Sequence, residues 1–255
     1  MNNNRIDSLF EQKKGLLSIY FTAGYPQLED TMSVLTALQE SGVDMVEIGM
    51  PFSDPLADGP VIQLASLKAL NNGITIKKLL EQIKDMRKTI TMPVVLMGYV
   101  NPVMHYGFEK FMADCQKVGV DGVIIPDLPF DEYIEHYKEM MDSYGIHYIP
   151  MIAPQSSDER IKYIDSKSSG FIYMVASAGV TGNIKASLDT RTQYYQRIKA
   201  LGLKNKAMIG FGIKDKESYE HACQNADGAI IGTAFIKNLT DKGIAATKQF
   251  ISAIR

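Results

Sequence analysis

Residues 43–60 read V-D-M-V-E-I-G-M-P-F-S-D-P-L-A-D-G-P, a short apolar strand followed by a loop rich in proline and glycine. Side chains alternate between the two faces of a strand, so Val43, Met45 and Glu47 are predicted to share one face. A carboxylate is unusual on such a face. Asp58 follows in the loop. A carboxylate inside a strand and a second one on the adjoining rigid loop form a candidate acid–base pair.

The bulk properties of the chain fit one large globular domain, residues 1–255, with 45% hydrophobic residues and no linker-like segment. With 27 basic and 29 acidic residues the net charge is −2, which argues against nucleic acid or an anionic membrane as the main partner. The N-terminus does not resemble a secretory signal, and the apolar runs are too short to span a bilayer. Cys115 and Cys223 are expected to be free buried thiols. We therefore expect a cytoplasmic protein.

Short apolar segments alternate with amphipathic segments along the whole chain. The eight predicted strands are 16–21, 45–48, 94–97, 122–125, 148–152, 171–175, 207–209 and 229–231. The predicted helices between and after them are 28–41, 61–71, 76–89, 108–118, 131–144, 157–166, 191–201, 214–224 and 243–254, with an extra N-terminal helix at 6–14. Four glycines follow helices at the position that favours a left-handed residue: Gly42, Gly119, Gly145 and Gly202.

This order predicts an α/β fold, a single (β/α)8 TIM barrel with a short extra N-terminal helix and a short helix, 234–238, after the eighth strand. A doubly wound open sheet is the alternative. Such a sheet usually has fewer strands and a glycine-rich turn after the first one. Here the turn reads T-A-G-Y-P at 22–26, which is no dinucleotide fingerprint. The barrel is therefore favoured.

Barrel enzymes place their sites at the carboxyl ends of the strands. The last three of these ends carry the glycine-containing loops A-S-A-G-V-T-G (176–182), G-F-G (210–212) and G-T-A (232–234). Each lets backbone N–H groups approach an anion, and Thr233 adds a hydroxyl at the start of the short helix. Any one loop could simply be a tight turn. Three consecutive ones favour a phosphate site.

The acidic candidates have structural alternatives. Glu47 could be a structural carboxylate paired with a lysine or arginine, although the predicted strands contain neither. Unpaired, it is expected to have a raised pKa suited to proton transfer. Asp58 taken alone fits a loop-capping role better. Tyr173 and Phe211 fit the filling of the barrel as well as contact with an aromatic ligand.

Other chemistries lack support in the sequence. The four histidines are scattered and no cysteine cluster exists, so we expect no metal site. There is no G-x-S-x-G elbow, and no lysine lies within a predicted strand for a Schiff base. General acid–base chemistry on a phosphorylated substrate remains.

One family matches these residues closely. The stretch V-E-I-G-M-P-F-S-D-P-L-A-D-G-P-V-I-Q resembles the signature of tryptophan synthase alpha chains. Shorter motifs follow in family order and cover nearly the whole chain: F-T-A-G-Y-P, G-Y-V-N-P-V-M-H-Y-G, V-I-I-P-D-L-P, A-P-Q-S-S-D-E-R-I, G-V-T-G and I-G-F-G-I. The resemblance implies a lyase that cleaves indole-3-glycerol phosphate to indole and glyceraldehyde 3-phosphate, in the last steps of L-tryptophan biosynthesis.

The resemblance also implies roles for individual residues. Glu47 would protonate indole C3 and take the proton from the adjacent hydroxyl, Asp58 would stabilise positive charge at the ring nitrogen, and Tyr173 would lie beside the reacting centre. The residues implied to bind the substrate are Tyr20, Tyr99, Thr181, Gly182, Phe211, Gly212, Gly232 and Thr233. Tyr20 and Phe211 would border the indole, and the three glycines and Thr233 would bind the phosphate.

The loop with Thr181 would close over the site and meet Asp58. Many relatives have Ser, often followed by Arg, where this chain has Ala176 and Ser177. This difference leaves the ordering of that loop open.

Finally, the resemblance implies a partner, the tryptophan synthase beta chain, in an alpha2beta2 heterotetramer. Pro51, Asp54 and Asn101 match positions at that interface. No cofactor is expected in this chain, since pyridoxal phosphate belongs to the beta chain, which receives indole through a tunnel.

Three alternatives stay open. The chain could be a stand-alone lyase that releases free indole. It could be an allosteric alpha-type subunit with weak catalysis, which the Glu47–Asp58 pair argues against. It could also be another phosphate-binding barrel, such as an indole-glycerol-phosphate synthase, which a catalytic lysine within a strand would favour.

Overall fold

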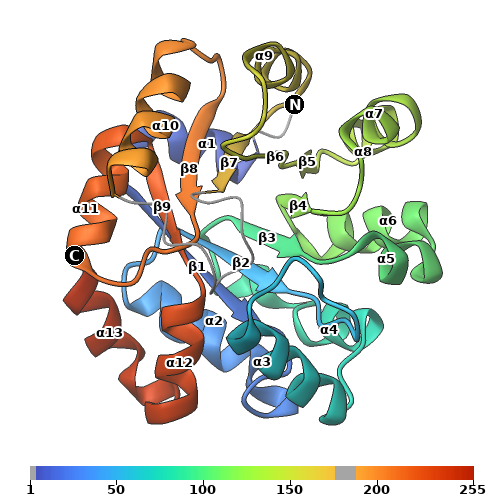
Figure 1. Ribbon diagram of the computed structural model, residues 1–255. Helices are drawn as coiled ribbons and strands as arrows, with labels where there is room; N and C mark the ends of the chain where they lie inside the picture. Colours follow the sequence, from blue (N-terminus) through green and yellow to red (C-terminus); the bar gives the residue numbers. More distant parts are fainter. Residues whose placement is uncertain (1–3, 176–187) are drawn as a thin grey trace.

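The computed structural model describes residues 4–175 and 188–255. Its strands form one parallel sheet in the order β5-β4-β3-β2-β1-β9-β8-β7-β6, surrounded by helices (Figure 1). The strands are β1 Leu16–Thr22, β2 Met45–Gly49, β3 Val94–Met97, β4 Gly122–Ile124, β5 His147–Tyr148, β6 Met151–Ile152, β7 Phe171–Val175, β8 Lys206–Gly210 and β9 Gly228–Ile231. All eight predicted strands are present. Except in the fifth strand, each strand end lies within one residue of its predicted position.

The predicted fifth strand, 148–152, is divided into β5 and β6. Pro150 has no N–H to donate, so the ladder is interrupted there. The Ile149 N–H nevertheless donates to the Val123 carbonyl at 2.9 Å, and the Tyr173 N–H donates to the Pro150 carbonyl at 2.9 Å. Because β5 pairs with β4 and β6 pairs with β7, this segment joins the two edges of the sheet and closes the barrel.

Alternation along β2 separates the inside of the barrel from the outside. Met45 belongs to a buried cluster made by inward-facing strand residues, whereas Val46 and Ile48 belong to the larger cluster between strands and helices. Val43 was predicted on the face of Met45 and Glu47, and this is wrong. It precedes β2 and packs in the outer cluster, because the strand alternation begins only at Met45.

The predicted helix 131–144 is divided into α7 and α8, and the other helices occupy the predicted places with three differences. They are α1 Arg5–Gln12, α2 Thr31–Glu40, α3 Pro60–Asn71, α4 Ile76–Gln82, α5 Val100–Tyr106, α6 Phe108–Val118, α7 Phe130–Glu132, α8 Lys138–Ser143, α9 Asp158–Lys167, α10 Leu188–Ala200, α11 Lys216–Asn225, α12 Thr233–Lys242 and α13 Thr247–Ile254. A π-helical turn, Tyr133–Tyr137, joins α7 to α8, and short 3-10 turns lie at Leu28–Asp30, Met86–Lys88 and Ile244–Ala246.

The first difference is α5, which was not predicted. Its proline lies in the first turn, where a missing N–H is tolerated. The second is α12, which runs to Lys242 and not to residue 238. The third is that the predicted helix 76–89 ends as a regular helix at Gln82. The four predicted left-handed glycines are confirmed, with φ between 61 and 84°.

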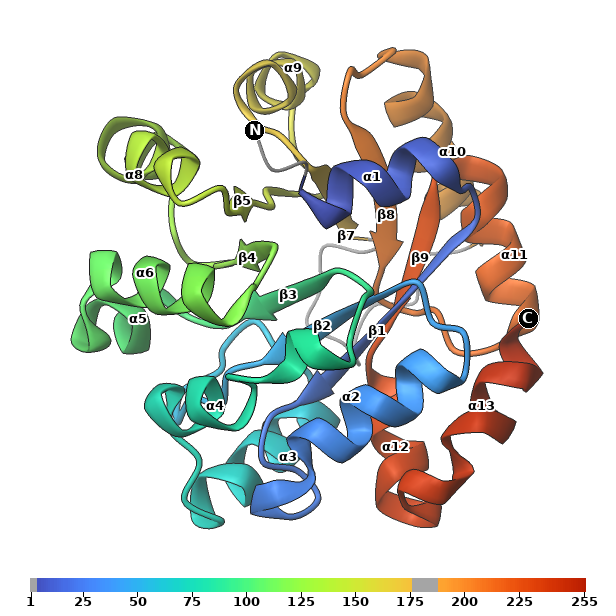
Figure 2. The same cartoon turned by 180° about the vertical axis from the view of Figure 1, so that it is seen from behind.

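Helix α1 covers the amino end of the barrel (Figure 2). The Asn4 side chain accepts a hydrogen bond from the Ile6 N–H and caps the helix. Ile6 and Phe10 are buried in the inner cluster, and the ring of Phe10 lies 5.7 Å from that of Phe171. The amino end is therefore sealed by packing.

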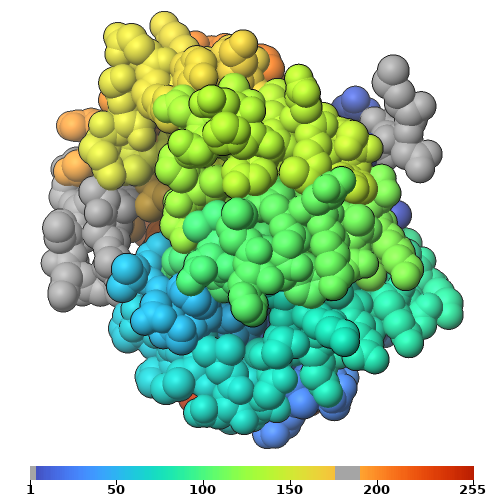
Figure 3. All heavy atoms as spheres, turned by 90° about the vertical axis from the view of Figure 1, so that its right-hand side faces the viewer, coloured from blue at the N-terminus to red at the C-terminus, as the bar shows by residue number. Residues whose placement is uncertain are grey.

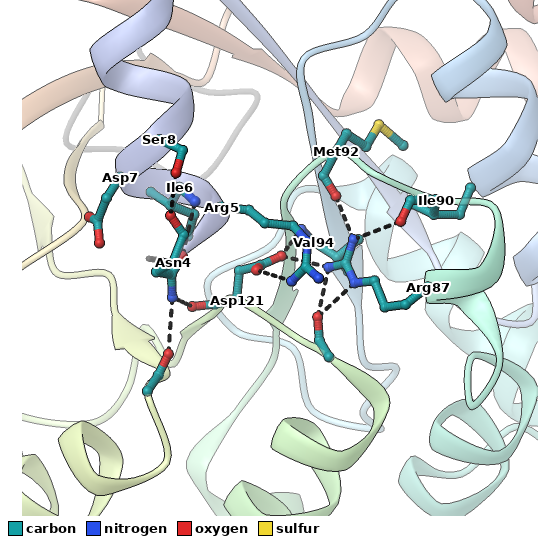
Figure 4. A network of polar contacts seen from close by, with 12 residues as sticks. Asn4, Arg5, Ile6, Asp7, Ser8, Arg87, Ile90, Met92, Val94 and Asp121 are labelled. Atoms are coloured by element: carbon teal, nitrogen blue, oxygen red, sulfur yellow. Dashed lines mark hydrogen bonds and ion pairs between the residues drawn. The ribbon is translucent and has the colours of Figure 1, made fainter. Parts of the chain in front are cut away.

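A polar network holds α1 in this place (Figure 4). Asp121, 3% exposed, accepts hydrogen bonds from Arg5 at 2.9 Å, from Arg87 at 2.6 Å and from the Val94 N–H at 2.8 Å. The Asn4 amide donates to the Asp121 carbonyl at 2.8 Å. With the amino end closed in this way, the carboxyl ends of the strands remain for a site.

No helix within the described ranges is long and apolar enough to cross a membrane.

Candidate active site

Glu47 lies in the middle of β2, inside the barrel, and is 0% exposed. One carboxylate oxygen accepts a hydrogen bond from the Ser18 hydroxyl at 3.3 Å. The other has no partner among the described residues. Burial raises the pKa of Glu47 to about 8, and the Ser18 hydrogen bond opposes this rise. Glu47 is therefore largely protonated at neutral pH and able to give a proton.

Asp58 lies at the end of the loop that follows β2 and is 9% exposed. The Tyr99 hydroxyl, from the end of β3, donates to its carboxylate at 2.9 Å. The same hydroxyl accepts the Ala57 N–H at 3.0 Å. Burial raises the pKa of Asp58 to about 6, and the Tyr99 hydrogen bond opposes this rise. Asp58 is thus mainly ionised at neutral pH.

Two further tyrosines face these acids from β1 and β7. Tyr20 is opposite Glu47 in the sheet register, and Tyr173 is 4% exposed. Burial raises the pKa of Tyr173 well above its usual value, and the charges of Glu47 and Asp58 add to this effect. The structure thus places the three predicted catalytic residues, Glu47, Asp58 and Tyr173, close enough for the two carboxylates to affect the pKa of the tyrosine.

Glycines at the ends of β2 and β8 make room for the two hydroxyls. A Cβ atom on Gly49 would lie 2.1 Å from the Tyr20 hydroxyl oxygen, and one on Gly210 would lie 2.0 Å from that of Tyr173. Gly49 was not singled out as a site residue, and Gly210 was named only as part of the G-F-G loop. The V-E-I-G and M-I-G strand endings are the signal that could have found them.

The loop after β8 has an unusual backbone. Phe211 has φ +70° and is the only non-glycine residue in the described ranges with a positive φ. Such a conformation is strained by about 1–3 kcal/mol and is typical of functional sites. The Phe211 ring packs edge-on against Tyr173, with the ring centres 6.0 Å apart. Gly212 follows with φ +78°.

The loop after β9 leads directly into α12. Gly232 precedes the helix and Thr233 is its first residue, and no side chain caps the first turn. The first N–H groups of a helix are unsatisfied by the helix itself and favour an anion. Strands β8 and β9 are neighbours, so Gly212 and Gly232 lie at adjacent strand ends. Gly232 also packs against Tyr20. A Cβ atom placed on the glycine would lie 3.4 Å from atoms of the Tyr20 side chain.

A small pocket opens at this end of the barrel beside Asp58. It is lined by Tyr20, Met50, Phe52, Asp58, Ser66, Met97, Gly98, Tyr99 and Pro126. Glu47, Tyr173 and Phe211 are not part of its lining. Of the predicted substrate residues, Tyr20 and Tyr99 line this pocket.

Some predicted residues lie outside the described residues: Ala176, Ser177, Thr181 and Gly182. Their predictions stay untested.

The three predicted partner contacts lie on the loop after β2 and on α5. Pro51 is half-buried, and Asp54 and Asn101 are exposed. Ser53 donates a hydrogen bond to Asp54 at 2.5 Å. In the space-filling view the light-blue segment near residue 50 adjoins the green segment near residue 100 (Figure 3).

Ser18 is a site residue that the sequence did not reveal. It is 0% exposed and is the partner of Glu47, yet a serine in an apolar strand gave no sign of its neighbour across the sheet. The strands do contain one lysine, because β8 begins one residue earlier than predicted. Lys206 is exposed at the amino end of β8 and pairs with Asp227 at 3.4 Å, away from the site. Among the described residues, no group of three or more metal-binding side chains occurs.

Comparison with known proteins identifies the family. The family model for the tryptophan synthase alpha chain matches residues 6–253. The tryptophan synthase alpha chain of Flavobacterium psychrophilum is 52% identical over 251 residues, which are 98% of this chain and 99% of the relative. That of Christiangramia forsetii is 51% identical over 252 residues, 99% of this chain and 98% of the relative. The crystal structure of the alpha chain from Legionella pneumophila superposes with a TM-score of 0.89 at 36% identity, covering 99% of this chain and 96% of that one. This chain belongs to the tryptophan synthase alpha chain family.

Proposed function

We propose that this chain carries out the lyase reaction of its family, the cleavage of indole-3-glycerol phosphate to indole and glyceraldehyde 3-phosphate, with Glu47 and Asp58 as its two catalytic carboxylates. The observation that carries the assignment is that both carboxylates are buried, act on the same residue, Tyr173, and have no cationic partner in the described ranges. Burial sets the pKa of Glu47 near 8 and that of Asp58 near 6. At pH 7 one is an acid and the other a base.

The proton cycle follows from these two states. Protonated Glu47 gives its proton to indole C3, and the positive charge that forms at the ring nitrogen is stabilised by the Asp58 carboxylate. Glu47, now ionised, takes the proton of the hydroxyl on the adjacent glycerol carbon. That carbon becomes the aldehyde, the bond to C3 breaks, and its electron pair returns to the ring. Glu47 ends the cycle protonated, so no proton is gained or lost.

The aromatic and glycine residues supply the remaining parts. Tyr20, Phe211 and Tyr173 border the indole. The phosphate binds at Gly212, Gly232 and Thr233, where the unsatisfied N–H groups at the start of α12 favour an anion. The reaction requires no cofactor in this chain, as is usual for the family.

An indole-release assay with indole-3-glycerol phosphate tests this proposal. Because Glu47 must be protonated and Asp58 ionised, the rate should follow a bell-shaped pH profile with limbs near pH 6 and 8. Asp58→Asn should remove the acid limb together with most of the activity. A chain that releases no indole at any pH, with or without a beta chain, would disprove the proposal.

We further propose that the partner is a tryptophan synthase beta chain, which holds pyridoxal phosphate and receives the indole. Support comes from the exposed apolar side chains. Four of the five large ones in the described ranges lie on the loop after β2, on α3 and on α5: Leu56 (82% exposed), Leu64 (67%), Leu67 (55%) and Met104 (49%). Pro51, Asp54 and Asn101 lie on the same loop and helix. Apolar side chains gathered within a polar surround are typical of a protein interface.

Substitution on this surface tests the partner. Met104→Glu should weaken assembly with a beta chain, measured by sedimentation or calorimetry. Tyr163→Glu is the matched control, because Tyr163 is the fifth exposed large side chain, 36% exposed, and lies on α9. Equal affinities for the two variants would exclude Met104 from the interface.

A stand-alone lyase is the alternative, and the intrinsic rate separates the two. If turnover without a beta chain equals turnover with it, the chain works alone. If a beta chain raises the rate, it is half of a complex.

A further inference from the structure

Arg191 lies in the first turn of α10, next to the loop that follows β8. One terminal nitrogen of its guanidinium lies 3.3 Å from the position that a Cβ atom would take on Gly212, and its central carbon lies 3.9 Å from that position. Any side chain at residue 212 would therefore press on the guanidinium. The glycine leaves room for the guanidinium beside the G-F-G loop.

This guanidinium has one buried donor that is not used within the described ranges. Its Nε atom is buried and has no hydrogen-bond partner in the part of the chain that the structure describes. Arg197, on the same helix, is different. It donates to the carbonyls of Pro154 at 3.0 Å and Ser156 at 3.1 Å and pairs with Asp158 at 3.5 Å. A half-buried cation without such partners is unfavourable and indicates an anion that arrives from outside.

We propose that Arg191 binds the phosphate group of the substrate. This inference rests on the proposed function and adds a charged side chain to a site otherwise made of backbone N–H groups and Thr233. Gly212 and Gly232 lie at the ends of adjacent strands, so an anion held between the two loops lies beside the guanidinium. A planar guanidinium presents a fork of N–H donors that matches phosphate oxygens.

The charge balance of the site favours such a cation. The substrate brings a phosphate that carries close to two negative charges at neutral pH. The two carboxylates in the site, Glu47 and Asp58, supply no positive charge to balance it. The uncapped start of α12 supplies about half a positive charge. Arg191 supplies a full one.

A purely structural role for Arg191 is less consistent with its surroundings. Its charge acts on Tyr195, where it opposes the rise of the pKa to about 12 that burial causes. A phenol with that pKa is neutral at pH 7 and gains nothing from a neighbouring cation. Tyr195 is 2% exposed and is held by packing.

Competitive inhibition with two probes tests the assignment. Glycerol 3-phosphate carries the phosphate and no indole, and indole carries no phosphate. Arg191→Gln should raise the inhibition constant of glycerol 3-phosphate and the KM for indole-3-glycerol phosphate by roughly 10- to 100-fold. The inhibition constant of indole should stay unchanged. Arg191→Lys, which keeps the charge, should restore most of the lost affinity.

The control is Lys199→Gln, which removes one positive charge from the exposed face of the same helix. It should change neither constant. If Arg191→Gln binds glycerol 3-phosphate as tightly as the wild type does, or weakens both probes alike, the assignment is wrong. A wild-type chain that neither releases indole nor binds glycerol 3-phosphate would instead overturn the proposed function.

A measurement on the wild type removes any dependence on how the variants fold. Phenylglyoxal modifies accessible arginines, and mass spectrometry of the peptide with Arg191 reports its rate. Glycerol 3-phosphate should protect Arg191 and leave Arg197 unprotected. Equal modification of Arg191 with and without glycerol 3-phosphate contradicts the proposal.

Discussion

Asp121, at the amino end of the barrel, is 3% exposed and accepts hydrogen bonds from Arg5 and Arg87, whereas Glu47, inside the barrel, is 0% exposed and accepts one, from the Ser18 hydroxyl. Both are buried carboxylates, the first directly before β4 and the second within β2. The first is surrounded by two guanidinium groups and a backbone N–H. The second has an oxygen without any partner in the described ranges.

The same contrast holds for a second pair. Asp44, also near the amino end, is 8% exposed, pairs with Lys13 and Arg255 and accepts the Leu17 N–H at 2.8 Å. The carboxylate of Asp58, at the carboxyl end, accepts a hydrogen bond from the Tyr99 hydroxyl and from no other described side chain. Asp121 and Asp44 connect elements and are paired with cations, and Asp165, which also connects elements, accepts two backbone N–H groups and the Asn205 amide. Where the chain leaves an acid unpaired, the acid keeps a pKa near neutrality, which is what proton transfer needs.

The largest expected effect comes from removing the unpaired acid. Glu47→Gln should reduce indole release by about 10²- to 10⁴-fold, the usual contribution of a general acid–base group. The fold should stay intact, since the amide has the same shape and no ion pair is lost. Circular dichroism and thermal unfolding verify the fold. Wild-type turnover in this variant would mean that Glu47 is not the catalytic acid.

The next effect concerns the paired acid. Asp121→Asn should lower the free energy of unfolding by about 3–5 kcal/mol, because it leaves Arg5 and Arg87 without their buried partner. The rate per folded molecule should hardly change. Urea unfolding measures the first and the indole assay the second. Asp85→Asn, which breaks an exposed pair with Lys88, is the control and should be almost neutral.

The third prediction uses pH to separate the two acids. The pKa of Glu47 rises from 4.5 in the unfolded chain to about 8 in the folded one, so between these values the unfolded state alone is ionised. Stability should therefore fall as pH rises through this window, by about 1.4 kcal/mol per pH unit. Glu47→Gln lacks this contribution. The difference between variant and wild type, from urea unfolding at pH 5 to 8, should grow with pH. A constant difference would mean that Glu47 titrates normally.

The smallest effect concerns the hydroxyl that holds Asp58. Tyr99→Phe removes the hydrogen bond that lowers the pKa of Asp58, so the acid limb of the pH–rate profile should move to higher pH by about one unit. Activity at pH 7 should fall about twofold, and the pH optimum should move up by about half a unit. Tyr106→Phe is the control, because its hydroxyl donates to Asp114 on α6. If both variants have the same pH–rate profile, the Tyr99 hydroxyl does not control the pKa of Asp58.

Much of the barrel follows from local sequence pattern. The apolar runs located all eight predicted strands, and the glycines after helices located their ends. The division at Pro150 was visible as a proline within a predicted strand, but its closing role depends on backbone contacts with β4 and β7 that lie far away in the sequence. Helix α5 was not predicted, because a proline argues against a helix unless it is known to lie in the first turn.

In the site, too, the residues that break a local sequence pattern were predicted, and those that act through distant contacts were not. Glu47 and Asp58 were found because a carboxylate in a strand and one on a rigid loop break the local pattern. Ser18, Gly49 and the role of Gly210 were not found, since their importance comes from one atom of a neighbouring strand. Arg191 looked like an ordinary helix residue until the structure placed it against Gly212.

Direct titration of the Glu47 carboxyl tests the central claim most closely, that this buried acid is kept unpaired so that it carries a proton at neutral pH. Selective ¹³C labelling of glutamate, with Glu47→Gln to assign the resonance, follows its side-chain carbon from pH 4 to pH 9. We predict a midpoint near pH 8. A carboxyl that is already ionised at pH 6 would contradict the account.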